Sequence, residues 1–242
     1  MKSISKMMVV AMILAAALVV APAAARTGAE IGDTVYYDIG DGDTIFAGEE
    51  HLNVSALFGG EKNGRLVHFS DPSAGSVDKI IEVANAHDFE LIKTTVGSTT
   101  GTYYAFNKSG DPIGAIKGAD ERKYVVVDIP KVTLDVVLDN SRTDSVDGKS
   151  VTRDNVLAFK LQNNLAGAFP DGKYAPQMKI EVYAPGGGTL TKFGDQELKD
   201  IKLNKSTIYV ENITLADEEA GAYTAQAKWF ADAKNPGAGF YG

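Results

Sequence analysis

The sequence predicts an all-β protein in which an N-terminal β-rich domain precedes a β-sandwich. Three observations support this fold class. Short segments rich in Val, Ile, Tyr, Phe and Thr recur along the chain. Turn signals made of Gly, Asp, Asn and Pro separate these segments at short intervals. A tyrosine motif near the C-terminus is typical of sandwiches of the immunoglobulin-like kind.

The expected strands follow from the apolar and β-branched segments. Residues 179–183 (KIEVY) alternate between polar and apolar, which is the pattern of a strand with one face on the core. Residues 124–127 (YVVV) are apolar on both faces, as in the core of a sandwich. Residues 76–87 could instead form one helix, because several of their apolar side chains recur at helical spacing. The remaining expected strands span residues 34–39, 44–47, 66–70, 79–83, 89–94, 102–106, 132–138, 156–161, 206–210 and 223–228.

A short internal repeat and a charged segment suggest how the chain is organised. GDTVY at residues 32–36 recurs as GDTIF at residues 42–46, which predicts a hairpin of two related strands. The charged, turn-rich segment at residues 117–123 predicts a domain boundary nearby. We therefore expect a signal peptide at residues 1–25, an N-terminal β-rich domain at 26–122 and an immunoglobulin-like β-sandwich at 123–242.

The sandwich prediction depends on the tyrosine motif. Asp217, Gly221 and Tyr223 form a D-x3-G-x-Y turn before an alternating segment, where a tyrosine typically packs inward and its hydroxyl bonds nearby backbone. The residues after 228 are Gly-rich, so we expect the sandwich to lack its last strand and a second copy to complete the open edge. The alternatives are that Phe240 and Tyr241 close the edge, or that the chain is truncated.

The N-terminus has the pattern of a secretory signal. Lys2 and Lys6 precede an apolar run at residues 7–20, and Ala23 and Ala25 occupy the small positions of an A-x-A site. Cleavage is expected between Ala25 and Arg26, whereas an uncleaved anchor would need a longer apolar run. No second apolar run of membrane-spanning length follows.

Composition narrows the classes of function. The chain has no Cys, so an exported fold must rely on its core, on glycans, on ions or on assembly. The formal net charge is −8 at pH 7. This charge disfavours binding to nucleic acid and leaves no polybasic patch for a membrane surface.

A resemblance to a known family rests on three segments. The string GDTIFAGEEHLNVS at residues 42–55 resembles the opening motif of an uncharacterised domain in surface proteins of methanogenic archaea. NVLAFKLQNNL at residues 155–165 and GAYT at residues 221–224 are similar to later segments of that family. The resemblance implies an S-layer, sheath or adhesin-like envelope protein, similar to the sheath-forming proteins of filamentous methanogens. No catalytic residues are established for that family, so none are carried over to this chain. We expect no cofactor, apart from the Ca²⁺ considered below.

Candidate sites are few. Asp38, Asp41 and Asp43 lie around the expected hairpin turn and could bind Ca²⁺, although the EF-hand spacing is missing and the same residues are common in tight turns. The three histidines show no zinc-site spacing. Trp229 and Phe230 could form a sugar platform, but a core or interface role is favoured. N-glycosylation sequons begin at Asn53, Asn107, Asn204 and Asn212.

These observations favour a non-enzymatic, secreted structural protein of an archaeal envelope. Its expected partners are further copies of itself, which together form a homopolymer in an S-layer or sheath. Other envelope proteins or glycans are further partners to consider. The alternative is an extracellular adhesin or carbohydrate-binding module, and an extracellular hydrolase is the weakest reading. Abundance in the envelope would separate the first two, because a lattice protein dominates and an adhesin is sparse.

Overall fold

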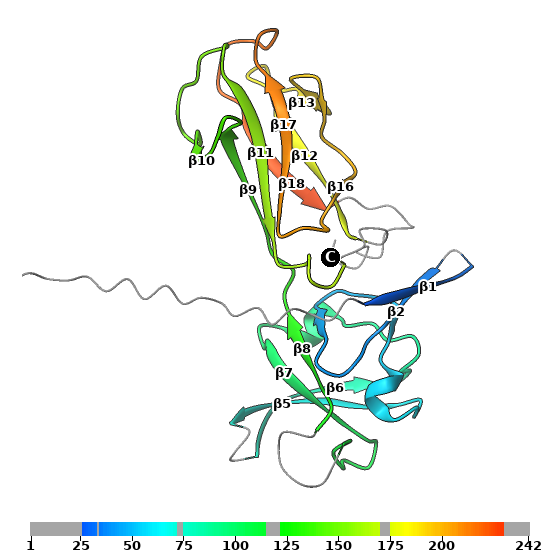
Figure 1. Ribbon diagram of the computed structural model, residues 1–242. Helices are drawn as coiled ribbons and strands as arrows, with labels where there is room; N and C mark the ends of the chain where they lie inside the picture. The colour runs from blue at the N-terminus through cyan, green and yellow to red at the C-terminus, as the bar shows by residue number, and fades with distance from the viewer. Residues whose placement is uncertain (1–25, 33, 72–74, 115–121, 170–174, 230–242) are drawn as a thin grey trace, which may run out of the picture.

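The computed structural model describes residues 26–32, 34–71, 75–114, 122–169 and 175–229. Its secondary structure is strand apart from one four-residue α-helix and one 3-10 helix in these residues, so the all-β prediction is confirmed. Figure 1 shows a sandwich at the top and a second β-rich half below it, with the chain passing from one to the other between β8 and β9.

The N-terminal half contains two sheets. The smaller has the order β1-β2-β4, with β1 antiparallel and β4 parallel to β2. The larger has the order β3-β8-β7-β5-β6, and all its pairs are antiparallel except β3 with β8. The elements of this half are β1 (Thr27–Ile31), β2 (Thr34–Asp38), β3 (Thr44–Phe46), β4 (Leu52–Asn53), η1 (Ser55–Phe58), β5 (Gly64–Asp71), β6 (Ser76–Val83), α1 (Lys93–Val96), β7 (Gly101–Phe106) and β8 (Tyr124–Asp128).

Two local expectations for this half were wrong, and the strand expected at residues 79–83 was confirmed against its helical alternative. The repeats at residues 32–36 and 42–46 do not form a hairpin, because β2 pairs with β1 while β3 lies in the other sheet beside β8. Residues 76–83 form a strand rather than a helix, since alternate positions reach the core at Ile81 and Val83. Residues 89–94 are not a strand: Phe89 makes an isolated bridge to Leu52, and α1 begins at Lys93.

The C-terminal half is a sandwich of two sheets. One has the order β10-β9-β11-β17, and the other joins β13, β12 and β16, with β18 also pairing β12. Side chains of β11 such as Phe159 and Leu161 pack with Ile180 and Val182 of β12 in one buried cluster. The strands of this half are β9 (Val132–Leu138), β10 (Ser141–Ser145), β11 (Val156–Asn163), β12 (Gln177–Tyr183), β13 (Thr189–Leu190), β14 (Lys192–Phe193), β15 (Gln196–Glu197), β16 (Ile201–Lys202), β17 (Thr207–Thr214) and β18 (Thr224–Trp229).

Strand order supports the immunoglobulin-like prediction. The neighbours β9-β11-β17 in one sheet and β12-β18 in the other match strands A-B-E and C-F of that fold. The expected tyrosine corner is also confirmed, because the Tyr223 hydroxyl donates to the carbonyl of Glu219 at 2.8 Å just before β18. The Tyr223 ring packs 5.2 Å from that of Phe193, which ties the corner to the sandwich core.

An ionic cluster links β12 to β18 on the sandwich surface. The Glu181 carboxylate accepts from Lys179 at 2.8 Å, from Lys228 at 2.6 Å and from the Tyr183 hydroxyl at 2.8 Å. These three donors, Lys179 first, lower the pKa of Glu181 to about 2.

The two halves share one buried apolar cluster. Leu165, Ala168 and Phe169, which follow β11, pack with core residues of the N-terminal half, and the Phe169 ring meets Tyr37 edge to face at 5.5 Å. Asn164 holds the connection, since its amide donates to the Ile129 carbonyl at 3.0 Å. The sheets change between β8 and β9, a few residues after the boundary expected at 122/123. The segment at 124–127 is therefore not a sandwich-core strand buried on both faces: it pairs with β3 and β7, and only its alternate residues Val125 and Val127 are buried.

Candidate functional site

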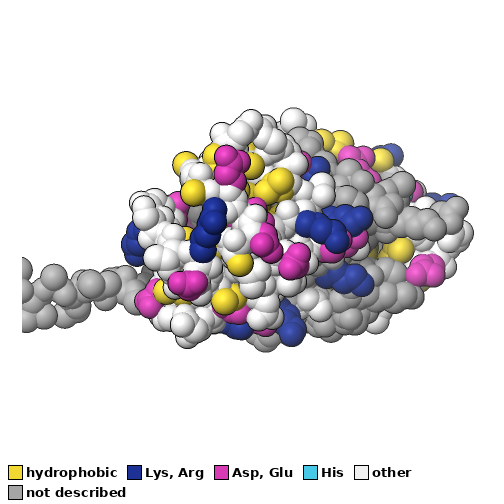
Figure 2. Space-filling view, turned by 90° about the horizontal axis from the view of Figure 1, so that it is seen from above, with side chains coloured by type: hydrophobic (Ala, Val, Ile, Leu, Met, Phe, Trp, Pro, Cys, Tyr) yellow, Lys and Arg dark blue, Asp and Glu magenta, His cyan; other side chains and the backbone are white. Residues whose placement is uncertain are grey.

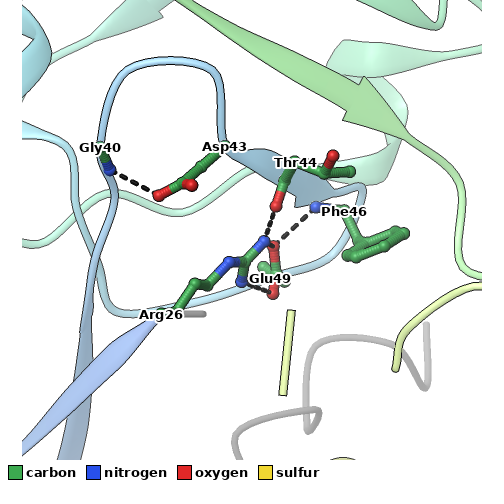
Figure 3. Close-up of polar contacts among 6 residues, drawn as sticks. All are labelled: Arg26, Gly40, Asp43, Thr44, Phe46 and Glu49. Carbon is green, nitrogen blue, oxygen red and sulfur yellow. Dashed lines mark hydrogen bonds and ion pairs between the residues drawn. The ribbon is translucent and has the colours of Figure 1, made fainter. Parts of the chain in front are cut away.

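The motif at residues 42–55 builds a buried ion pair, which we call the Arg26–Glu49 clasp (Figure 3). Glu49 lies on the tight turn after β3 and accepts the Phe46 N–H at 2.6 Å. Its carboxylate also accepts hydrogen bonds from both terminal nitrogens of Arg26, with Nη1···Oε1 at 2.5 Å and Nη2···Oε2 at 3.2 Å. The second of these nitrogens donates to the Thr44 carbonyl as well.

The clasp is excluded from water. The side chains of Arg26 and Glu49 are 0% and 2% exposed. The Arg26 guanidinium lies 5.3 Å from the centre of the Phe169 ring, which comes from the sandwich half. A buried ion pair costs less when its remaining hydrogen-bonding groups are satisfied. Thr44 and Phe46 satisfy several of these groups, while Arg26 Nε is buried without a hydrogen-bond partner among the described residues. The clasp therefore fixes the start of β1, the turn after β3 and the junction between the halves.

The three aspartates proposed for Ca²⁺ accept hydrogen bonds from different partners. The Asp43 carboxylate, which is buried, accepts the Gly40 N–H at 2.7 Å, and the Asp41 carboxylate accepts the N–H of Tyr124 at 2.8 Å. Asp38 accepts from the Asn53 amide at 2.8 Å. Burial raises the pKa of Asp43, while the Gly40 hydrogen bond and the Arg26 charge act in the opposite direction.

Metal binding gains no support from this arrangement. Among the described residues, no three His, Cys, Asp or Glu side chains come together as ligands for an ion. The histidines are dispersed: His51 contacts Asp88 at 2.9 Å, His68 contacts Asp78 at 3.1 Å, and His87 lies on an exposed segment. The Ca²⁺ site at Asp38, Asp41 and Asp43 thus stays a prediction from sequence.

The four sequon asparagines lie in different surroundings. Asn53 is half-buried, and its side chain bonds both Asp38 and Ser55, so a glycan there would cost these contacts. Asn107 is half-buried after β7 and its side chain bonds Asp111. Asn204 lies between β16 and β17, and Asn212 is exposed at an irregularity of β17 with φ 58°. Glycosylation at Asn107, Asn204 and Asn212 remains a prediction.

A surface hollow of about 420 Å³, which we call the Tyr36 groove, lies beside the small sheet. Its floor is the outer face of β1, β2 and β4, and its wall is the segment at residues 85–88. The polar and aromatic side chains that line it are Tyr36, Asp38, Asn53, Asn85, His87 and Asp88.

Sequence reasoning missed most of these residues. Arg26 was noted only as the first residue after the expected cleavage site, and it lies outside the motif that contains Glu49. Phe169 carried no signal of its own, and Tyr36 was noted only as part of the repeat at residues 32–36, because their partners are distant in sequence. Trp229 is half-buried against the cluster shared by the two halves, which agrees with the favoured core or interface role, while Phe230 lies outside the described residues.

The structure is an all-β chain of two packed halves. Its motif at residues 42–55 contributes Glu49 to a buried structural ion pair, the Arg26–Glu49 clasp. The chain belongs to the family of the domain of unknown function DUF3821, which matches residues 41–242. The match includes Glu49 but not Arg26. No curated protein and no solved structure matches the chain at a significant level. In the described part of the chain, no helix is long and apolar enough to span a membrane.

Proposed function

We propose that this protein is a secreted, non-enzymatic structural component of an archaeal cell envelope, which assembles with copies of itself into an S-layer or sheath. The signal-peptide pattern at residues 1–25 supports export. The resemblance of residues 42–55 to archaeal surface proteins supports an envelope location. The clasp supports a structural role for that motif, because the Glu49 carboxylate is buried and bonds Arg26 and the Phe46 N–H within the fold.

The observation that carries the proposal is the open edge of the large N-terminal sheet. Within the described residues, β6 pairs with β5 on one side and with no strand on the other. Val77 and Ile80 on this strand are 52% and 46% exposed. An unpaired eight-residue strand offers backbone N–H and C=O groups to a strand of another chain. In a lattice protein this edge would serve as a joint between copies.

The sandwich offers a second edge and a hydrated surface. Considering only the described residues, β18 pairs with β12 alone, which fits the expectation that another copy completes this sheet. Figure 2 shows the sandwich end of the molecule, where Lys, Arg, Asp and Glu side chains are interspersed with small apolar areas. Glycans at Asn204 or Asn212 would add to this hydration, and one at Asn107 would hydrate the N-terminal half. An intact mass above that of the bare chain would reveal them.

Abundance is the first test. Mass spectrometry of intact envelopes should find this chain among the dominant proteins, with an N-terminus at Arg26. A sparse protein would favour the alternative, an adhesin or carbohydrate-binding module. A chain that still begins at Met1 would contradict export by signal cleavage.

Mutation of the β6 edge is the second test. The double change Val77→Lys and Ile80→Lys places charge on the proposed joint and should abolish polymers seen by electron microscopy, while the melting temperature stays unchanged because both side chains are exposed. The matched control is Val156→Lys, at a residue 38% exposed on the sandwich. Equal assembly of the double variant and the control would place the joint elsewhere.

A further inference from the structure

The Tyr36 groove is built by side-chain alternation in the small sheet. Tyr37 is 3% exposed and points into the core, so its neighbours Tyr36 and Asp38 point to the outer face. In the register of the sheet, Ala29 lies opposite Tyr36, and Asn53 lies beside Asp38. The small Ala29 side chain leaves the Tyr36 ring accessible from the groove.

The groove is held in shape by contacts that need no ligand. The Tyr36 ring meets His51 edge to face at 5.3 Å, and His51 in turn contacts Asp88 of the wall. Backbone bonds fix the wall segment, since Val54 N–H donates to the Ala86 carbonyl at 2.7 Å and Leu52 exchanges two bonds with Phe89. A preformed site spares a ligand the entropic cost of ordering the protein.

Several polar groups in the groove remain available to a ligand. Among the described residues, the Tyr36 hydroxyl, the Asn85 amide nitrogen and the His87 ring have no hydrogen-bonding partner. The Asp38 carboxylate accepts from Asn53 at one oxygen and from the Thr27 hydroxyl at the other, whereas Asp88 contacts only His51 among the described residues. A carboxylate has about four acceptor positions, so both groups keep capacity for a ligand. The groove thus combines donors and acceptors with an aromatic ring.

Charge selects the class of ligand. Of the residues that the structure describes, no Lys or Arg lines the groove, whereas Asp38 and Asp88 do, so phosphate and acidic ligands are repelled. Amides and carboxylates beside an aromatic face instead suit an uncharged ligand that has many hydroxyls and an apolar C–H face. The volume falls in the range of small-molecule sites.

We infer that the Tyr36 groove binds a neutral pyranose sugar at the end of, or within, an envelope glycan. The Tyr36 ring packs against the C–H face of the sugar. Asp38 and Asp88 accept from sugar hydroxyls, and Asn85 donates to them. Sugar binding here is separable from the proposed polymer, because the groove and the β6 edge share no residue.

The test is an NMR titration of the exported chain with cellobiose, lactose and N,N′-diacetylchitobiose in the millimolar range. At least one sugar should move the backbone amide signals of Tyr36, Asn53, Asn85 and Asp88. Tyr36→Ala should weaken that binding roughly tenfold or more, which corresponds to about 1.4 kcal/mol. Tyr36→Phe should weaken it less, because the ring remains.

Controls separate a sugar site from other outcomes. Tyr209→Ala removes a half-buried tyrosine on the sandwich and should leave binding unchanged. If Tyr36→Ala unfolds the sheet, Asn85→Ala replaces it as the test variant. Asn85 is exposed, so this change should leave the melting temperature unaltered. The inference is wrong if none of the three sugars moves these amides, or if calcium chloride alone moves them and the sugars do not. Whether the β6 variant loses its polymers has no bearing on this sugar titration, so the two proposals fail or hold separately.

Discussion

Replacement of Glu49 by alanine should be far more damaging than its position on a turn suggests. The change removes the carboxylate that neutralises Arg26, whose side chain is 0% exposed, and it deprives the Phe46 N–H of its acceptor. Removal of one partner of a buried, hydrogen-bonded ion pair costs about 3–5 kcal/mol, because the other charge stays buried without compensation. For a chain of this size, that loss lowers the melting temperature by roughly 10 °C.

A double change distinguishes the clasp from simple loss of packing. Arg26→Met combined with Glu49→Leu replaces both charges with apolar side chains, which is often neutral or stabilising relative to the pair. We therefore expect the double variant to recover most of the stability that Glu49→Ala loses. The recovery would show that the uncompensated Arg26 charge, rather than a missing side chain, causes the loss.

Urea unfolding followed by circular dichroism measures these differences. Glu50→Ala is the matched control, because Glu50 is the adjacent glutamate of the same motif and is only half-buried. It should change the midpoint little. If Glu49→Ala shifts the midpoint no more than Glu50→Ala does, the Arg26 charge is hydrated in solution and the clasp as described here does not exist.

Three further changes test other parts of the fold. Tyr223→Phe removes the hydroxyl bond to Glu219 and should cost about 1 kcal/mol in urea unfolding, and an unchanged midpoint would argue against the tyrosine corner. Gly64→Ala places a Cβ 2.4 Å from the buried Phe58 ring and should cost about 1–3 kcal/mol, whereas a silent change would mean that this ring can move. The pKa of Glu181 falls from 4.5 to about 2 on folding, so its stabilising effect is complete above pH 4.5 and is lost as the pH falls toward 2. Glu181→Gln should remove that part of the acid dependence in thermal melts, and identical pH profiles would contradict it.

Local patterns predicted the positions of the strands whose burial alternates. The alternation at residues 179–183 reappears in β12, where Ile180 and Val182 are buried and their neighbours are not. The apolar segment at 124–127 became β8, with strands on both sides. Such patterns succeed because side-chain direction in a strand depends only on the residue's own position.

Strand partners could not be predicted in the same way. The repeat at 32–36 and 42–46 correctly indicated two strands, but it suggested that they pair with each other. Instead, β3 is parallel to β8, about eighty residues away, because Ile45 and Phe46 are buried there. The helical spacing at residues 76–87 was outweighed by pairing with β5, which buries Ile81 and Val83 on one face.

The sequence by itself determined the all-β class, most strand positions, the tyrosine corner and the motif at residues 42–55. These features are encoded by residues close together in the chain, and each has a local physical cause in turn geometry or burial. Only the tertiary structure decided what the motif holds and where a ligand could bind. Arg26 meets Glu49, the Phe169 ring lies against the Arg26 guanidinium, and Tyr36 lines one groove with Asn85 and Asp88. These contacts join residues that are far apart in sequence, so they exist only once the sheets of the N-terminal half have formed and the sandwich has packed against them.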